Sequence, residues 1–438
     1  MTVLRNAAEA IVRRLRQAGF EAVFAGGCVR DRLLGLEPID YDIATSARPD
    51  QVETLFERTI PVGKQFGIVI VVIDGMNFEV ATFREDGPYI DGRRPASVRF
   101  SDSRTDALRR DFTINAMFED PVSGEVIDHV GGRADLADGV VRAVGDPRAR
   151  FGEDRLRMIR AVRFATRFGF AIDPPTLTAI RQEPDRLAVV SAERIGEEVV
   201  RILTEGSAKA GFELLDETGL LAVVLPEITA MKGCEQSPDH HPEGDVFVHT
   251  MLCLSHLVAG CTESLALGVL LHDVAKPVTA QLRDGRHTFY GHLERGAEMA
   301  AEICARLRRS RAVTERVEFL VAQHLRHCSA PDMRPATLKR FLRQDGIDEL
   351  LELTRIDGLS SNGDLAYYEF FRNALADMGE ERARPVPLLD GNDLIELGME
   401  PGPLFGMILR AVEDQQLDGT LTTRDQALEF VKSRWIAR

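Results

Sequence analysis

Two aspartates separated by one residue, Asp40 and Asp42, follow an apolar segment that opens with Gly26–Gly27. Alternate side chains of a strand share a face, so both carboxylates would point one way and Tyr41 the other. Carboxylates this close repel unless a cation lies between them, and oxygen ligands at this spacing suit Mg²⁺. Glu79 would add a third carboxylate if its strand lies beside the first. An isolated Asp-x-Asp is more often a solvated strand end, so its neighbours decide the interpretation.

The residues before the aspartates favour an anion site. Gly26 and Gly27 let backbone N–H groups approach a ligand at the start of a helix, and Arg30 follows within one helical turn. Together with the carboxylates, this pattern predicts a metal ion beside a bound triphosphate.

The segment Gly26–Ser46 resembles the signature of polymerase-β-like nucleotidyltransferases, in the class II branch of bacterial CCA-adding enzymes and poly(A) polymerases. Further similar motifs follow in the same order along most of the chain. They lie in Leu108–Asp120 (R-R-D-x-x-x-N-A), Ile127–Pro147 (D-x-x-G-G-x-x-D-L), Phe151–Phe170 (E-D-x-x-R-x-x-R-x-x-R-F), Ser191–Glu198 and Leu388–Leu409.

The resemblance implies template-independent transfer of nucleotides from CTP and ATP to the tRNA 3′ end, with release of pyrophosphate. Asp40 and Asp42, with Glu79, would then be catalytic, and the two aspartates would hold two Mg²⁺ ions. Arg30 and Arg110 are candidates for binding the triphosphate, and Gly27 offers a backbone contact.

A helix expected from Glu153 carries Asp154, Arg157, Arg160 and Arg163 at a spacing of three, so they drift slowly around one face. A carboxylate beside a guanidinium can read the edge of a base. By resemblance, Asp154 and Arg157 would read cytosine or adenine, and the two later arginines would lie near the phosphates or support the pocket. A salt-bridged surface helix is the alternative.

Asp111 and Asn115 are predicted to begin a helix and to position the loop Arg84–Phe100. In the resembling family this loop is tied to the switch from adding C to adding A. Its presence favours complete CCA addition or A addition over an enzyme that adds only C.

Nine of the ten histidines lie between residues 240 and 327. The ordered set resembles the HD superfamily of metal-dependent phosphohydrolases. His249, His272, Asp273 and Asp357 would hold one ion, and His292 and His324 a second. Imidazole and carboxylate ligands suit Mn²⁺, Ni²⁺, Co²⁺ or Zn²⁺, and Mg²⁺ is the alternative ion for this site. Such a site would hydrolyse phosphate esters or 2′,3′-cyclic phosphates; the alternative is a degenerate HD domain kept for packing or tRNA contact.

The elements expected to carry these candidate residues indicate an α+β fold. Strand, glycine turn and helix follow one another near Glu21–Gly35, and two β-rich runs over 66–83 predict a hairpin. We expect a polymerase-β-like head with a mixed sheet (1–145), a helical neck and body (146–232), an all-α HD domain (233–378) and a helical tail (379–438).

The composition of the chain limits the kinds of partner that the protein could bind. The chain has 438 residues and a net charge of −15, which argues against nucleic acid on average, but seven arginines cluster over 148–167. RNA binding that weakens steeply with salt is therefore expected. The amphipathic first segment and the lack of roughly 18 to 20 consecutive apolar residues predict a cytoplasmic protein without a membrane partner. A monomer and a homodimer both stay open, as do two alternative functions, a poly(A) polymerase or A-adding enzyme, and an HD phosphohydrolase with an RNA-binding head.

Overall fold

The computed structural model describes residues 3–88, 96–238, 241–378 and 386–436. The chain divides into two compact units. Unit 1 comprises Met1–Thr229, Leu257–Gly260 and Arg306–Arg308, and unit 2 comprises Ala230–His256, Cys261–Ala305 and Arg309–Arg438. Within the described ranges, no helix combines the length and the apolar character that a membrane span requires.

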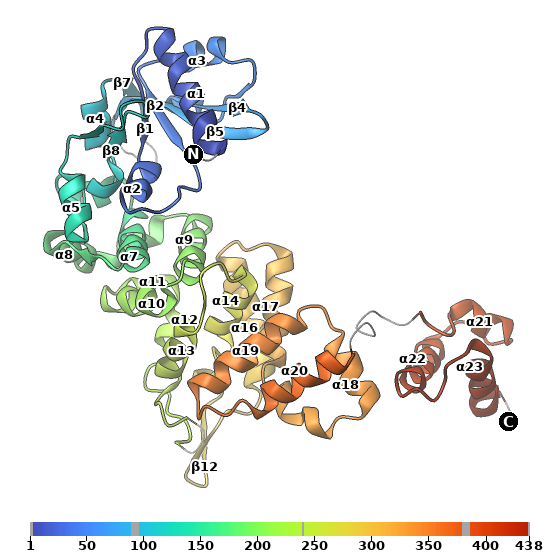
Figure 1. Cartoon of the computed structure of the whole chain (residues 1–438). Helices are drawn as coiled ribbons and strands as arrows, with labels where there is room; N and C mark the ends of the chain where they lie inside the picture. The colour runs from blue at the N-terminus through green and yellow to red at the C-terminus, as the bar shows by residue number, and fades with distance from the viewer. Residues whose placement is uncertain (1–2, 89–95, 239–240, 379–385, 437–438) are drawn as a thin grey trace. The chain divides into compact units, whose positions relative to one another are not determined.

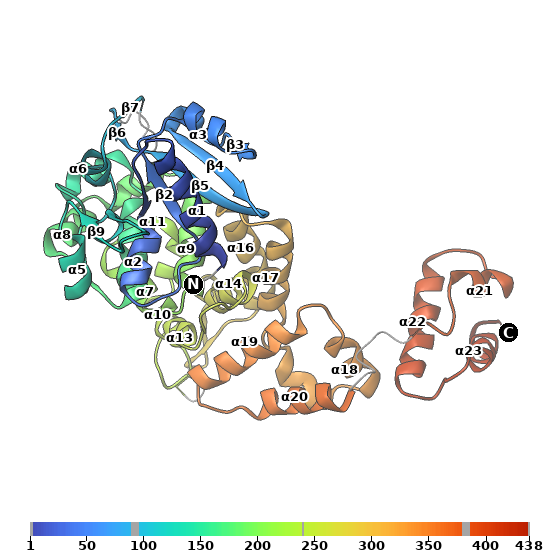
Figure 2. The same cartoon turned by 45° about the horizontal axis from the view of Figure 1, so that its top comes forward.

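Unit 1 begins with a seven-stranded mixed sheet of order β3-β4-β5-β2-β1-β8-β9. Neighbouring strands are antiparallel except β2 and β5, which run parallel. Figure 2 shows β2, β4 and β5 side by side, with the amphipathic helix α1 (Val3–Gln17) packed against the sheet. The strands are β1 (Ala22–Ala25), β2 (Asp42–Thr45), β3 (Thr59–Ile60), β4 (Ile68–Ile73), β5 (Met76–Thr82), β8 (Met117–Glu119) and β9 (Val126–Asp128).

The predicted hairpin is confirmed as β4 and β5. The run IVIVVI is entirely β-branched, which favours an extended backbone. Asp74 and Gly75 both have positive φ angles, 50° and 78°, as a two-residue type I′ turn requires. Ile43 of β2 is paired with Val80 of β5, so the strand that carries Glu79 lies beside the strand that carries Asp42.

The rest of unit 1 is mainly helical. The helix α7 buries Met158, Ile159 and Val162 on one face. The elements are α2 (Gly27–Leu33), α3 (Pro49–Leu55), η1 (Lys64–Phe66), β6 (Arg84–Asp86), β7 (Val98–Phe100), α4 (Ser103–Leu108), η2 (Thr113–Asn115), α5 (Gly132–Asp138), β10 (Val140–Val141), α6 (Pro147–Glu153), α7 (Arg157–Phe168), β11 (Ala171–Ile172), α8 (Pro174–Gln182), η3 (Pro184–Val189), α9 (Ala192–Thr204), α10 (Ala208–Glu217), α11 (Leu220–Val224) and α12 (Pro226–Thr229).

Unit 2 is built around α14 (Glu263–Leu271), which lies beside α13, α17 and α19 (Figure 1). Residues 265–271 of α14 are all buried, as expected for a helix that is apolar on every side. The other helices are α13 (Val246–Ser255), α15 (Lys276–Thr279), α16 (His292–Arg306), α17 (Arg311–Gln323), η4 (Arg326–Asp332), α18 (Pro335–Leu342), α19 (Ile347–Ser360) and α20 (Ala366–Met378).

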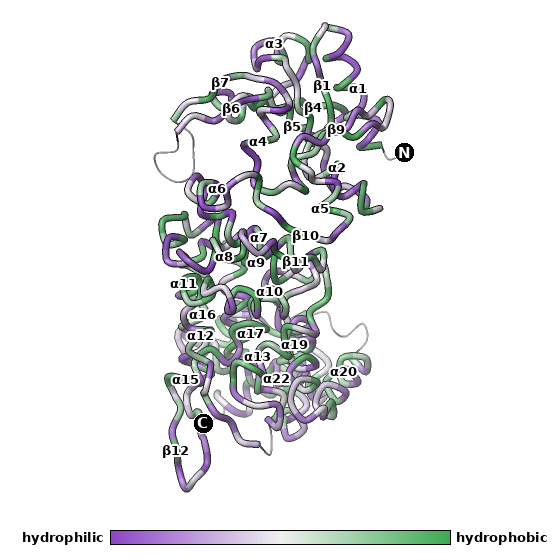
Figure 3. Tube along the Cα trace, turned by 90° about the vertical axis from the view of Figure 1, so that its left-hand side faces the viewer, coloured by the Kyte–Doolittle hydropathy of each residue, from purple (hydrophilic) through white to green (hydrophobic). Residues whose placement is uncertain are grey.

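One hairpin departs from the expected all-α HD domain. β12 (Gln281–Arg283) pairs with β13 (Arg286–Thr288) through Asp284 and Gly285, both with positive φ angles. The hairpin is largely hydrophilic (Figure 3), and β12 is exposed, so no alternating apolar pattern marked it as a strand.

The C-terminal segment has a small core of its own. It contains α21 (Gly391–Glu396), α22 (Pro403–Leu417), α23 (Arg424–Val431) and η6 (Lys432–Ile436). The buried side chains Leu394, Ile408, Val412, Ala427 and Val431 pack together. The helical tail is thus confirmed, while the boundaries between the four predicted parts stay a prediction.

Candidate active site and metal centre

The glycine turn after β1 brings an arginine close to the backbone. Gly26 has a φ of 73°, and a Cβ atom there would lie 2.9 Å from Nη1 of Arg110. The same arginine donates to the backbone oxygen of Asn115 (3.1 Å) and pairs with the buried Asp106. Glycine at position 26 therefore allows both the turn and the approach of a guanidinium group to the start of α2.

Asp40 and Asp42 lie at the edge of this turn, but only Asp42 belongs to a strand. The predicted strand over both residues is wrong by two positions, since β2 begins at Asp42, opposite Ala25 of β1. Tyr41 is nevertheless buried, with its ring 5.0 Å from that of Phe24. The alternation expected from the sequence is thus kept at Tyr41 even though pairing starts one residue later.

The carboxylates form a site of unfavourable negative charge. Burial, and then the nearby Glu79 and Asp40, raise the pKa of Asp42 to about 7. Burial also raises the pKa of Glu79, although Arg84 opposes the shift. A bound cation would remove the repulsion, and an all-oxygen donor set fits a hard divalent ion such as Mg²⁺.

Arg30 is held rigidly beside this site. Its guanidinium donates to Oδ1 of Asn115 (2.5 Å) and to Oδ1 of Asp31 (2.7 Å), and it stacks on the rings of Phe164 and Phe168. Only 5% of the residue is exposed. Arg30 thus links the glycine turn to α7.

Asp111 and Asn115 surround a short 3₁₀ turn, η2, rather than the helix start that was predicted. Oδ2 of Asp111 accepts two hydrogen bonds from Arg160 (2.6 and 2.9 Å), and Oδ1 accepts one from Asn115 (3.1 Å). Burial alone would raise the pKa of Asp111, but Arg160 and Arg157 outweigh it and lower the pKa to about 2.

The loop expected to be positioned by these two residues is only partly described, because residues 89–95 lie outside the described ranges. The N–H of Arg84, at the start of this loop, donates to Asp106. At the start of the loop, therefore, the side chain that contacts the backbone belongs to α4.

The expected helix from Glu153 is interrupted, which corrects the placement of Asp154. Asp154 is extended, with a φ of −146°, between α6 and α7. Its Oδ1 accepts the N–H of Leu156 (3.1 Å), a local bond that competes with helix continuation. Its carboxylate also receives two bonds from Arg194 of α9 (2.6 and 3.1 Å).

The three arginines of α7 that the sequence singled out have different partners. Arg157 donates to Glu153 (2.7 Å) and to the backbone oxygen of Arg109 (3.0 Å). Arg160 is bound to Asp111, whereas the nearly buried Arg163 donates to Glu198 (2.6 Å). These arginines are thus ion-paired, as the salt-bridged alternative expected, and they also border a cavity; the reading of a base stays a prediction.

Within unit 1, a cavity of about 610 Å³ brings together the glycine turn with its two aspartates and the arginines of α7. Among the residues that the sequence predicted for catalysis and nucleotide binding, Glu79 does not line this cavity. The others do: Gly27, Arg30, Asp40, Asp42, Arg110, Asp111, Asn115, Asp154, Arg157, Arg160 and Arg163. Sequence reasoning missed Arg109, Arg167, Arg194 and Arg201, which also line it. Arg194 lies in Ser191–Glu198, one of the segments that resemble the family, although nothing in that segment pointed to Asp154.

The histidines of unit 2 converge from four helices. The imidazoles of His272, His292 and His324 each donate Nδ1–H to the backbone oxygen three residues earlier, at 2.7–2.9 Å. This contact fixes the tautomer and leaves Nε2 as the atom that can bind a ligand. His249 is oriented in the same way, because its Nδ1 lies 2.7 Å from Oε1 of Glu243.

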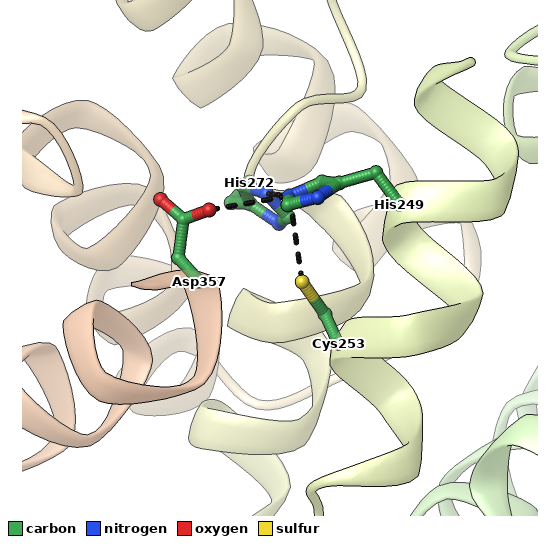
Figure 4. A group of neighbouring side chains, drawn as sticks. All are labelled: His249, Cys253, His272 and Asp357. Atoms are coloured by element: carbon green, nitrogen blue, oxygen red, sulfur yellow. Dashed lines mark hydrogen bonds and ion pairs between the residues drawn. The ribbon is translucent and has the colours of Figure 1, made fainter. Parts of the chain in front are cut away.

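Two neighbouring groups could hold metal ions. One contains His249, Cys253, His272 and Asp357, whose side chains point toward one another (Figure 4). The other contains Asp273, His292 and His324. Asp273 therefore lies with the pair predicted for a second ion, although its Oδ2 is also 3.3 Å from Nε2 of His272.

The second group fits a cation on its own geometry. Oδ1 of Asp273 and Nε2 of His292 are buried without a hydrogen-bond partner in the described residues, and they lie 4.0 Å apart. Nε2 of His324 is 3.6 Å from the same carboxylate oxygen. Oδ2 of Asp273 accepts from the buried Lys276 (2.6 Å). A divalent ion would give the facing oxygen and nitrogen atoms a partner.

Comparison with known proteins gives three family models. The Poly A polymerase head domain matches residues 22–142, the "Probable RNA and SrmB- binding site of polymerase A" matches 169–232, and the HD domain matches 249–360. The sheet from β1 to β9 lies within the first model, α8 to α12 within the second and the histidine cluster within the third, whereas α6 and α7 lie between the first two.

Curated relatives match half or nearly all of the chain. The CCA-adding enzyme of Bacillus pumilus is 47% identical over 211 residues, which are 48% of this chain and 52% of that protein. The chain thus spans about half the length of that relative in the alignment. The CCA-adding enzyme of Levilactobacillus brevis is 33% identical over 424 residues, 96% of both chains. Among solved structures, the Bacillus stearothermophilus CCA-adding enzyme in complex with CTP has a TM-score of 0.72 at 27% identity over 99% of both chains.

Proposed function

Because the chain belongs to the family of the CCA-adding enzymes, we propose that it adds C, C and A, taken from CTP and ATP, to the 3′ end of tRNA. The observation that carries this proposal is the cavity in which Asp40 and Asp42, the arginines beside the glycine turn, and Asp154 with Arg157 meet. Carboxylates, phosphate-binding groups and a base-reading edge are the three parts that untemplated nucleotidyl transfer needs.

In the proposed reaction the tRNA 3′-hydroxyl attacks the α-phosphorus of the nucleotide. A new P–O bond forms, the bond to pyrophosphate breaks, and the proton of the hydroxyl passes to solvent. Asp40 and Asp42 would hold Mg²⁺, with Glu79 nearby; when bound, Mg²⁺ supplies neutralisation of the phosphate charge. Arg110, Arg30 and the N–H of Gly27 would orient the triphosphate.

The pair Asp154 and Arg157 suits cytosine and adenine for one chemical reason. Both bases present an amino group beside a ring nitrogen that accepts a hydrogen bond, whereas uracil and guanine present a carbonyl beside an N–H. A carboxylate accepting from the amino group and a guanidinium donating to the ring nitrogen would select the first two bases. Asp111, Asn115 and Arg160 would hold the floor of this pocket, and Arg163 would support it.

The test is extension of a tRNA that lacks its terminal CCA, with CTP and ATP offered separately and together. Addition of C, C and then A supports the proposal. Long A tails would instead favour a poly(A) polymerase of the same family, and no extension would leave an HD phosphohydrolase whose head only binds RNA. A cytoplasmic location follows from the proposed substrate, and the same preparation can be sized to distinguish a monomer from a homodimer.

For unit 2 we propose an HD phosphohydrolase that acts on phosphate esters or 2′,3′-cyclic phosphates. Its support is the convergence of anchored imidazoles with Asp273 and Asp357, which would bind a divalent ion such as Mn²⁺, Ni²⁺, Co²⁺, Zn²⁺ or Mg²⁺. When bound, the ion supplies Lewis acidity toward a phosphate ester. Release of phosphate from such substrates by the full chain tests the proposal; no release with any of the five ions would contradict it.

We also propose the four-part division into 1–145, 146–232, 233–378 and 379–438. Each of the three family models lies inside one of the first three parts, which supports it. Limited proteolysis that cuts near residues 145, 232 and 378 is the expected result.

A further inference from the structure

Arg201 of α9 differs from every other arginine that lines the cavity of unit 1. Each of the others is ion-paired to a carboxylate. Among the residues that the structure describes, no hydrogen bond or ion pair involves the side chain of Arg201. This residue is exposed where it borders the cavity, so its charge and its N–H donors are available to a ligand.

The carboxylates at helical spacing do not neutralise Arg201. Glu197 and Glu205 lie four residues before and after it, where an ion pair across one helical turn could form. Oε2 of Glu205, which also lines the cavity, lies instead 3.3 Å from Nη1 of Arg163 and 3.6 Å from Nη1 of Arg167, both on α7. The packing of α9 against α7 thus directs this carboxylate away from Arg201.

Arg167 is a second cation at this end of the cavity whose pairing is incomplete. Its contacts with carboxylate oxygens are 3.6 Å to Glu205 and 3.9 Å to Asp31, beyond the roughly 3.2 Å that a hydrogen bond spans. Within the described ranges, therefore, neither Arg167 nor Arg201 uses its side-chain N–H groups in a hydrogen bond to protein.

The position of Arg201 on α9 separates it from the base-reading pair. Arg201 follows Arg194 by seven residues, so the two share one face of the helix and lie about 10 Å apart along its axis. Arg194 is bound to Asp154, and the triphosphate is proposed to lie at the glycine turn. The tRNA 3′ end carries backbone phosphates toward the same cavity with its hydroxyl, and these phosphates need cations of their own.

We propose that Arg201, together with Arg167 of α7, binds a backbone phosphate of the tRNA 3′ strand and so positions the strand that is extended. This inference rests on the proposed CCA addition and specifies how the RNA substrate is held. A guanidinium donates two parallel hydrogen bonds to a phosphodiester, and the contact releases a counterion from the RNA.

The test measures binding of a tRNA that lacks CCA to the full chain at increasing salt, without nucleotide. R201A should weaken binding by about tenfold and reduce the slope of log Kd against log salt by roughly 0.7–1, as expected for one lost phosphate contact. In extension assays R201A should raise the KM for tRNA by a similar factor and leave the KM for CTP unchanged. R201K keeps the charge and should recover the slope.

R133A is the matched control, since Arg133 is also exposed in unit 1 but does not line the cavity. It should match the wild type in both assays. A raised KM for CTP alone would place Arg201 on the triphosphate and overturn the inference. Equal tRNA affinity of R201A and R133A, or an R201K that behaves like R201A, would overturn it too. In these cases extension by the wild type leaves the proposed function standing, whereas a wild type that neither binds nor extends tRNA overturns both.

Discussion

At Asp42, three carboxylates are brought close together at a cost to folding. Burial and the two neighbouring acids raise its pKa to about 7, so the charged form is unfavourable near neutral pH without a cation. D42N should therefore lower nucleotide incorporation by about a hundredfold or more while raising the thermal midpoint of the metal-free protein. Extension assays and thermal unfolding in chelator measure the two effects. The control is D138N at an exposed position, which should change neither, and an active D42N would refute the metal assignment.

Asp111 has the opposite electrostatic situation, because Arg160 and Arg157 outweigh its burial and lower its pKa to about 2. A folded pKa below the unfolded value of about 4 stabilises the protein above pH 4, and this contribution is lost as the pH falls toward 2. D111N should cost about 2 kcal/mol of unfolding free energy at pH 7. Urea unfolding of both proteins from pH 7 to 3 should show the difference shrinking below pH 4; a difference that grows there would contradict the assignment.

Arg194 holds Asp154 with two charge-assisted hydrogen bonds, so in the proposed site it would act on the base through that carboxylate. Without it Asp154 can rotate, and R194A should reduce selectivity for CTP over UTP by about tenfold or more. Single-nucleotide incorporation with each triphosphate measures this selectivity. R186A, at an exposed arginine of the same unit, is the control; equal selectivity in R194A and R186A would argue against the positioning role.

At the scale of elements, the motif D-x-x-G-G fixes the contact between α5 and η2. Asp128 accepts four backbone N–H groups over 130–133, which ties down the start of α5. A Cβ atom on Gly132 would lie 2.2 Å from the backbone oxygen of Thr113. The close approach of α5 therefore sets the position of η2, whose Asn115 binds Arg30 and Asp111.

Gly132 is predicted to be irreplaceable in this contact. G132A should destabilise unit 1 by about 1–3 kcal/mol and raise the KM for nucleotide, because η2 must move. G152A is the control, since a Cβ there meets nothing within 4 Å and its φ is not positive. Denaturant unfolding and nucleotide kinetics compare the two; equal behaviour of both variants would show that α5 does not set η2.

At the scale of the whole molecule, the two proposed chemistries belong to different compact units. The cavity lined by Asp42 lies in unit 1, and the cluster containing His272 lies in unit 2. D42A should therefore abolish tRNA extension and spare phosphate-ester hydrolysis, and H272A should do the reverse. Assaying both activities on both variants checks this, and loss of both in either folded variant would show that the sites depend on each other.

The net charge of −15 is also a property of the whole molecule that conceals the site. Nine arginines line the cavity, against six acidic residues, so the average acidity does not extend to the region that would meet phosphate. The cluster over 148–167 indicated this, but the arginines at positions 109, 194 and 201 lie outside it. They join the cavity only because α9 packs against α7 and the chain before η2 contacts Arg157 of α7.

The sequence by itself determined what is local. Spacings of two and three residues and the glycine turn pointed to Asp40, Asp42, Arg30 and Asp154, because a strand or helix places such residues together without help from the rest of the chain. Asp40 and Asp154 nevertheless lie just outside the strand and the helix. The β4–β5 hairpin followed from two β-rich runs separated by a turn. The start of β2 and the break at Asp154 did not follow from local spacing, since pairing with β1 and a side-chain bond to Leu156 set them.

Only the tertiary structure decided which distant residues meet. The bond between Asp154 and Arg194 spans 40 positions, and Asp357 joins His249 and Cys253 from a different helix. Nothing in local spacing encodes such contacts, because they depend on how buried helix faces pack and on which charges must be paired once water is excluded. The sequence thus showed which residue types could do chemistry, whereas packing fixed the partners that orient Asp154 and the grouping of His249 with Cys253 and Asp357.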